Sequence, residues 1–321
     1  MKKEKMKKAL GKTRIVVIVV IGILLLFVAI SFINHRIRLN IESEIRSPIG
    51  TMVNVNDHQM HVYTEGSGTK TLVFMSGGGT SSPVLDFKGL YSKLSSQYRI
   101  VVVEKAGYGY SETAAVSRDI DSILEETRTA LTLAGEQAPY ILYPHSMSGI
   151  EALYWAQKYP EEVTAIIGLD PAVPAAYEKY PLPSDFTMGL TSFAARVGIT
   201  RFFPSIVDSS AAIQENHLSE QEKKVYRAVF YEKTQSSNMI EEVKMISNNA
   251  KKVSEGDIPD VPMYFFISNG KEIPVDGWGN LLMKYVETAN GKYMILDSGH
   301  YIHDHEPEII AEESMKFIES I

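Results

Sequence analysis

The chain has 321 residues, of which 45% are apolar and 22% are charged, an ordinary globular composition that can build one large domain. It contains no cysteine, which excludes disulfide bonds, thiolate metal sites and a cysteine nucleophile. The formal net charge of −7 is unevenly spread, because residues 1–14 carry seven basic groups and one acidic group. The remaining residues have 25 basic and 38 acidic groups, a balance of −13. A domain this acidic is repelled by nucleic acid, so we expect no nucleic-acid partner.

Residues 15–33 are almost continuously apolar and carry no charge. A helix of about 19 residues can cross the hydrocarbon core of a lipid bilayer, which is about 30 Å thick. The basic residues of 1–14 precede this run, and only Arg36 and Arg38 follow it closely. The positive-inside rule then predicts a cytoplasmic tail (1–14), a transmembrane helix (15–33) and an extracytoplasmic domain of a single-pass cell-membrane protein. The alternative is a cleaved signal peptide processed near Ala29-Ile30-Ser31, although the apolar run is long for that purpose.

The next residues predict a stalk and then alternating strands and helices. After a polar, partly helical stalk (34–50), Thr51–Val55 and Met60–Thr64 predict a β-hairpin. Six further short apolar runs predict strands: Thr71–Met75, Ile100–Val103, Tyr140–Tyr143, Val163–Leu169, Met263–Ile267 and Tyr293–Leu296. Helical spacing predicts the intervening helices: Pro83–Leu94, Ile120–Leu133, Ile150–Lys158, Asp276–Val286 and a last one from about Pro307. This alternation indicates an α/β fold with a mostly parallel central sheet and helices on both faces.

The alternation stops between about Pro171 and Asp260, where the sequence is helix-rich and shows no strand pattern. An insertion after a strand of an open sheet lies over the carboxyl edge, where ligands bind. We therefore expect an α/β core formed by 51–170 and 261–321, with a helical lid at 171–260. Large apolar side chains of this lid are expected to form mostly its own core: Phe186, Met188, Phe193, Phe202, Phe203, Tyr226 and Phe230.

The most informative motif is Tyr140–Gly149, in which strand-like sequence ends at Ser146 and helix-like sequence follows at once. A serine at a sharp strand-to-helix turn exposes its hydroxyl, and the helix N-terminus offers N–H groups to a developing anion. Such a turn needs small residues two positions to either side, and here these are Pro144 and Ser148. The alternative role for Ser146 is a helix N-cap. We predict that it is a nucleophile.

His300 follows the last predicted strand and is the expected base, because the pKa of histidine suits proton transfer near neutral pH. His303, Asp304, His305 and Glu306 lie close by in the sequence, so a metal site is an alternative. Their spacing matches no familiar zinc pattern, and we expect no metal ion.

Together these features resemble the α/β-hydrolase fold superfamily, over about residues 50–321. The resemblance rests on four motifs in order: Ser76-Gly77-Gly78-Gly79, Gly107-Tyr108-Gly109-Tyr110-Ser111, His145-Ser146-Met147-Ser148-Gly149 and Gly299-His300. The detailed sequence of these motifs is most similar to that of small membrane-anchored hydrolases of bacteria. The resemblance implies a serine hydrolase that needs no cofactor and cleaves a small-molecule ester or amide through an acyl-enzyme. The chain order of such enzymes is serine, acid, histidine.

Two carboxylates are candidates for the acid of this triad. The superfamily usually places it after the strand Met263–Ile267, where this sequence offers Glu272, and a minority of relatives place it after the preceding strand, where Asp170 stands. We favour Asp170, because it emerges directly from a core strand. The oxyanion hole is expected to consist of backbone N–H groups of Met147 and Gly78.

Two other functions are compatible with the same motifs. The first is an aminopeptidase of the proline-iminopeptidase type, which uses the same serine constellation. The second is a catalytically silent binding or sensor domain that has kept the fold.

Overall fold

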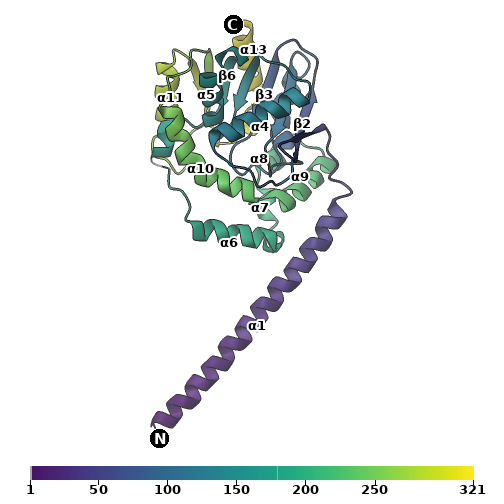
Figure 1. The fold of residues 1–321 in the computed structure, drawn as a ribbon, viewed down its shortest axis with the longest axis vertical. Coiled ribbons are helices and arrows are strands. Elements are labelled where there is room, and N and C mark those ends of the chain that lie inside the picture. The colour runs from purple at the N-terminus through teal and green to yellow at the C-terminus, as the bar shows by residue number, and fades with distance from the viewer. Residues whose placement is uncertain (1, 179) are drawn as a thin grey trace.

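The computed structural model describes residues 2–178 and 180–321, and its centre is an eight-stranded sheet (Figure 1). The strands are β1 (Thr51–Val55), β2 (His58–Glu65), β3 (Thr71–Met75), β4 (Arg99–Glu104), β5 (Tyr140–Pro144), β6 (Val163–Leu169), β7 (Met263–Ile267) and β8 (Lys292–Ile295). Their order across the sheet is β1-β2-β4-β3-β5-β6-β7-β8. β2 pairs antiparallel with β1 and β4, whereas all other neighbours are parallel. The predicted α/β class with a mostly parallel sheet is confirmed.

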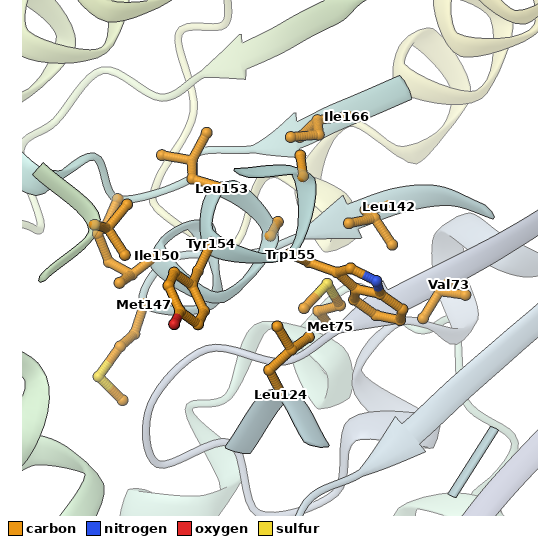
Figure 2. Close-up of a cluster of buried hydrophobic side chains, with 14 of the residues drawn as sticks. Val73, Met75, Leu124, Leu142, Met147, Ile150, Leu153, Tyr154, Trp155 and Ile166 are labelled. Atoms are coloured by element: carbon orange, nitrogen blue, oxygen red, sulfur yellow. The ribbon is translucent and has the colours of Figure 1, made fainter. Parts of the chain in front are cut away.

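Helices cover both faces of this sheet. The helices of the core are α2 (Pro83–Asp86), α3 (Lys88–Leu94), α4 (Ile120–Leu133), α5 (Ser148–Lys158), η1 (Pro160–Glu162), α11 (Trp278–Thr288), α12 (Ile302–His305) and α13 (Pro307–Glu319). Successive side chains of a strand point to opposite faces, so Val73 and Phe74 of β3 are both fully buried in separate apolar clusters. Figure 2 shows the first cluster, in which Trp155 of α5 packs toward the strand residues Val73 and Leu142. Burial on both faces explains why the strands have continuous apolar sequences.

The parallel arrangement brings the carboxyl ends of several strands to one edge of the sheet. β3 is followed by Gly77, β5 by Ser146, β6 by Asp170 and β8 by His300. Residues from four separate parts of the sequence are therefore delivered to the same edge, which is where ligands bind in open α/β sheets.

Between β6 and β7 lies the inserted segment, residues 171–260, which is helical throughout its regular elements. Its elements are η2 (Pro174–Glu178), α6 (Asp185–Arg196), η3 (Ile199–Phe202), α7 (Ser205–Asp208), α8 (Ala211–Gln214), α9 (Glu220–Lys233) and α10 (Ser237–Ser254). Serine N-caps begin the three longest helices, because Ser184, Ser219 and Ser236 each accept a backbone N–H with their hydroxyl. At Ser219 the helix start is a complete capping box with Glu222.

The side chains of the inserted segment differ from the expectation that its aromatic residues form its own core. Met188 and Tyr226 are buried as expected. Four phenylalanines are instead 49–80% exposed: Phe186, Phe193, Phe202 and Phe203. For these four the prediction is wrong, because helical spacing identifies residues that share a face but not what covers that face.

Helix α1 (Lys2–Glu42) projects away from the rest of the protein (Figure 1). Its part from Leu10 to Glu42 is apolar and long enough to cross a membrane, a property that a signal sequence near the N-terminus shares. The helix continues to Glu42 without a break, so the first half of the predicted stalk (34–50) is helical.

Candidate active site

The turn after β5 holds Ser146 in a conformation that few residues other than glycine adopt. Its φ angle is +53°, and its carbonyl accepts hydrogen bonds from the backbone N–H groups of Gly149 at 2.9 Å and Ala172 at 2.7 Å. A Cβ atom added at Gly149 would lie 2.2 Å from the carbonyl oxygen of Ala172, so this position requires glycine. The Ser148 hydroxyl donates to the carbonyl of Met75 at 2.6 Å and thereby ties the turn to β3. The positive φ, an uncommon conformation, is thus fixed by contacts on both sides.

His300 and Asp170 meet at the edge of the sheet. Nδ1 of His300 lies 2.6 Å from Oδ2 of Asp170, although the two residues are 130 positions apart. Ser268 donates to both carboxylate oxygens, with its N–H at 2.9 Å and its hydroxyl at 2.6 Å, and Nε1 of Trp278 donates at 2.9 Å. Donation from Nδ1 to the carboxylate leaves Nε2 of His300 as the free basic nitrogen.

These contacts determine the charge of Asp170, whose side chain is fully buried. Burial alone raises the pKa of the Asp170 carboxyl, but the hydrogen bond and charge of His300 and the two bonds from Ser268 outweigh it, so the pKa lies below its usual value. Asp170 is therefore a carboxylate at neutral pH.

Glu272, the other candidate acid, also contacts His300, but at a different atom. Its Oε2 accepts the backbone N–H of His300 at 2.7 Å. A Cβ atom added at Gly299 would lie 2.7 Å from that same carboxylate oxygen, so the glutamate is packed closely under the loop. Of the two carboxylates, Asp170 bonds the imidazole and Glu272 bonds the main chain.

A cavity of about 440 Å³ opens beside these residues, and both Ser146 and His300 line it. Within the described residues no hydrogen bond joins the Ser146 hydroxyl to His300, although both side chains border this one cavity. Gly78 and Met147 also line the cavity, and a Cβ atom at Gly78 would lie 2.4 Å from Cε of Met147. The rest of the wall is mainly apolar and comes largely from the inserted segment: Tyr177, Leu182, Met188, Met239, Ile240 and Val243.

Some polar residues of the site were not singled out from the sequence. Ser268 and Trp278 donate to Asp170 as described above, and His145 lies beneath His300, with ring centroids 4.6 Å apart. Nε2 of His145 donates to the carbonyl of His300 at 3.2 Å, and burial lowers the pKa of His145 well below its usual value. His145 is therefore neutral. The one available signal was position, because Ser268 directly follows β7 and His145 directly precedes Ser146.

The histidines after His300 have other contacts. Within 2–178 and 180–321 there is no group of three or more histidine or acidic side chains arranged to hold a metal ion. His303 is fully buried, and Nδ1 of His305 lies 2.8 Å from Oε1 of Glu215.

A buried cluster of charges connects the inserted segment to the core next to the site. Nζ of Lys105, in the loop after β4, lies 2.5 Å from Oε1 of Glu151 on α5 and also contacts Oε1 of Glu242 on α10. Burial lowers the pKa of Lys105, but the two carboxylates outweigh it and the pKa lies above its usual value. Lys105 is therefore charged and holds α10 against the core.

Comparison with known proteins identifies the family of this fold. The sequence matches the α/β hydrolase fold family over residues 70–307. It is 43% identical to the uncharacterized protein YbdG of Bacillus subtilis, over 76% of each chain. It is 33% identical to a pimeloyl-[acyl-carrier protein] methyl ester esterase of Aliivibrio salmonicida over 36% of this chain and 41% of that protein. The structure resembles that of the enol-lactonase from Burkholderia xenovorans with a TM-score of 0.60 and 14% identity, covering 84% of this chain and 100% of the lactonase.

The match of the family covers most of the chain and includes every strand from β3 to β8. These similarities, the strand order and the turn at Ser146 have a single explanation. The chain belongs to the α/β hydrolase fold family.

Proposed function

We propose that this protein is a membrane-anchored serine hydrolase that cleaves an ester or an amide through an acyl-enzyme. The observation that carries the proposal is the 2.6 Å contact between Nδ1 of His300 and the Asp170 carboxylate, at the edge of a cavity that Ser146 also lines. A serine hydroxyl is a weak nucleophile until a neighbouring base removes its proton. A histidine with its Nδ1 bonded to a carboxylate presents Nε2 in the form that can do so.

The reaction follows from these roles. Nε2 of His300 takes the proton from the Ser146 hydroxyl while Oγ of Ser146 attacks the carbonyl carbon of the substrate. The negative charge that forms on the carbonyl oxygen accepts hydrogen bonds from the backbone N–H groups of Met147 and Gly78, each of which contributes on the order of 3 kcal/mol. His300 then gives its proton to the departing alcohol or amine, and an acyl group remains on Ser146. A water molecule, deprotonated by His300, releases the acid and restores the serine.

We infer two further features of the same proposal. The inserted segment is a lid that covers the site, because it forms much of the cavity wall. Helix α1 is an uncleaved anchor with its N-terminus in the cytoplasm and the hydrolase domain outside. The basic residues of 1–14 and the length of the apolar helix support this orientation.

A fluorophosphonate probe, which reacts covalently with activated serines, tests the nucleophile. We expect the full chain in detergent to be labelled and Ser146→Ala to lose labelling completely. Ser95→Ala, at a partly exposed serine that does not line the cavity, serves as the matched control and should label like the wild type. Persistent labelling of Ser146→Ala would overturn the assignment.

The two alternatives predicted from the sequence are tested in the same preparation. Turnover of aminoacyl amides without turnover of simple p-nitrophenyl esters favours the aminopeptidase. A folded wild-type protein that is inert to both substrates and to the probe favours the silent binding domain.

A further inference from the structure

The inserted segment presents an apolar face to the outside of the protein. Phe186, Leu190 and Phe193 of α6 are 80%, 57% and 49% exposed, and their i, i+4, i+7 spacing places them on one side of the helix. Phe202 and Phe203, at the end of η3, which follows α6 in the chain, are 50% and 55% exposed. We call these five residues the outer face. Exposed apolar patches of this kind mark interaction sites in soluble and membrane proteins.

The charge of this region supports the same reading. The 25 residues from 182 to 206 include only three charged side chains, Asp185, Arg196 and Arg201, in a chain that is 22% charged overall. At the average frequency this stretch would have five or six charges. The surface around the outer face is thus poor in the groups that keep a protein surface in water.

Contacts with α1 locate this region relative to the apolar part of that helix. The rings of Phe27 and Phe202 pack with their centroids 5.4 Å apart, and the Ser31 hydroxyl donates to the carbonyl of Val197 at 2.6 Å. Both Phe27 and Ser31 belong to the apolar run 15–33. Phe27 lies six residues before the end of that run, which corresponds to about 9 Å along a helix.

Beyond the apolar run, polar contacts also hold α1 against the inserted segment. Arg201 of η3 donates to both carboxylate oxygens of Glu42 at 2.7 and 2.6 Å, and its Nε donates to Nδ1 of His35 at 2.8 Å. Because α1 is held at both levels, its position against the inserted segment is defined. Figure 1 shows α6 at the base of the domain next to the upper part of α1, at the end opposite α13.

The other side of α6 faces the candidate active site. Thr187, Met188 and Thr191 line the cavity that contains Ser146 and His300. Helix α6 therefore lies between the cavity and three residues of the outer face, Phe186, Leu190 and Phe193.

We propose that the outer face lies in the outer leaflet of the bilayer that α1 spans, and that the site takes its acyl substrate from that leaflet. This inference rests on the proposed membrane anchor and serine hydrolase. If Phe27 is within the membrane, its contact partner Phe202 lies at the same depth, and the rest of the outer face meets lipid. The expected substrate is an amphiphile whose acyl chain stays in the membrane while its ester carbonyl enters the cavity beside α6. The mainly apolar cavity wall fits the part of the chain that adjoins the ester carbonyl.

The absence of cysteine from the sequence makes a direct test of depth possible. Phe186→Cys in the full chain is labelled with a nitroxide and reconstituted in phosphatidylcholine nanodiscs. We expect its collision rate with lipid-soluble oxygen to exceed that with a water-soluble nickel chelate. Ile321→Cys at the C-terminus is the matched control, because Ile321 is an apolar residue, 39% exposed, at the end of the domain opposite α6 (Figure 1). At Ile321 the order of the two collision rates should be reversed.

Two results of this measurement would overturn the proposal. Equal behaviour of the two labels would show that the outer face is in water. A label at position 186 shielded from both oxygen and the nickel chelate would show that another protein covers the face.

A triple variant, Phe186→Ser with Leu190→Ser and Phe193→Ser, tests the route of the substrate. None of these side chains lines the cavity. We expect hydrolysis of a water-soluble short-chain p-nitrophenyl ester to equal that of the wild type, and hydrolysis of a long-chain p-nitrophenyl ester dissolved in the nanodisc to be lost. Equal hydrolysis of the long-chain ester by both proteins would overturn the proposed route.

The outcomes separate this inference from the function on which it rests. A wild-type protein that hydrolyses neither ester contradicts the proposed hydrolase, whereas the nitroxide result still reports the depth of the outer face. A wild-type protein that hydrolyses the short ester while the label at position 186 lies in water contradicts the membrane docking alone.

Discussion

His300 and His303 are three residues apart, and each faces a buried aspartate, but the two pairs differ in distance and in hydrogen bonding. Nδ1 of His300 lies 2.6 Å from Asp170, whereas Nε2 of His303 lies 3.8 Å from Asp86. Asp170 accepts three further hydrogen bonds. Asp86 accepts one, from the Tyr226 hydroxyl at 3.0 Å.

Different charge states of the two aspartates follow from this difference in contacts. Burial raises the pKa of Asp86 to about 7, and burial lowers the pKa of His303 to about 3. At neutral pH His303 is therefore neutral and Asp86 is only partly ionised, whereas Asp170 is an anion. The comparison teaches that a buried carboxyl group stays ionised only where short contacts and additional donors offset the loss of hydration.

The largest expected effect on turnover comes from removing the charge of Asp170 in its pair with His300. Asp170→Asn keeps the shape of the side chain but removes the negative charge that holds the Nδ1–H tautomer of His300 and stabilises its imidazolium form, so we expect kcat for a p-nitrophenyl ester to fall about 10⁴-fold. The control is Asp297→Asn, an exposed carboxylate near the same loop, with an unchanged kcat. A loss of less than tenfold in Asp170→Asn would contradict the role of this pair.

The corresponding change in the pair of Asp86 and His303, Asp86→Asn, should affect stability instead of turnover. The folded protein keeps the proton of Asp86 up to a pKa of about 7, while the unfolded chain loses it near 3.8. The stability that this group provides at low pH is therefore lost as pH rises from about 4 to 7. Asp86→Asn removes that loss, so its free energy of unfolding at pH 8 should exceed that of the wild type by a few kcal/mol, on the order of 1.4 kcal/mol per pKa unit.

Urea unfolding of both proteins in detergent at pH 4 and pH 8 measures this effect. The advantage of Asp86→Asn should be much smaller at pH 4, and kcat should be unchanged at both values. An equal difference in stability at the two pH values would contradict a raised pKa for Asp86.

Trp278→Phe weakens the support of Asp170 but leaves the pair of Asp170 and His300 in place. It eliminates the 2.9 Å hydrogen bond to Oδ1 of Asp170, and a bond to a charged group contributes about 1.5 kcal/mol or more. We expect kcat to fall about tenfold. The matched control is Trp155→Phe, which removes the other indole N–H of the chain, bonded to Glu162. That variant should leave kcat unchanged, and an equal loss of kcat in both variants would assign the effect to general destabilisation.

The smallest expected effect is that of Glu272→Gln. The amide oxygen of glutamine can still accept the backbone N–H of His300, so only the charge assistance of one hydrogen bond is lost. We expect a decrease in kcat of about fivefold or less, corresponding to ~1 kcal/mol. A loss comparable to that of Asp170→Asn would show that Glu272 supplies the charge that His300 needs.

These pairs also show how far the sequence alone could predict the site. Ser146 and His300 follow strand-like runs, so their arrival at one edge of the sheet follows from the order of the elements. Asp170 and Glu272 could not be separated with the same certainty, because both follow strands that end at this edge. The spacing of residues does not tell whether a carboxylate reaches an imidazole or a main-chain N–H.

The fold was more predictable than the surroundings of its helices. Strand runs such as Thr71–Met75 and Val163–Leu169 were predicted with their observed bounds, because strands buried on both faces have continuous apolar sequences. Phe186 and Phe193 were assigned to an interior, since their spacing is that of a helix face. Whether protein, water or lipid covers that face depends on the whole structure. A local sequence pattern does not contain this information.

The ammonium group of Lys105 between Glu151 and Glu242 has a consequence for how molecules can enter the cavity. Swinging α10 outward would leave buried charges without their partners, which costs about 3–5 kcal/mol when a buried pair is broken. We therefore expect α10 to stay in place as a stationary wall during turnover. Substrate and product would then enter and leave the cavity beside α6.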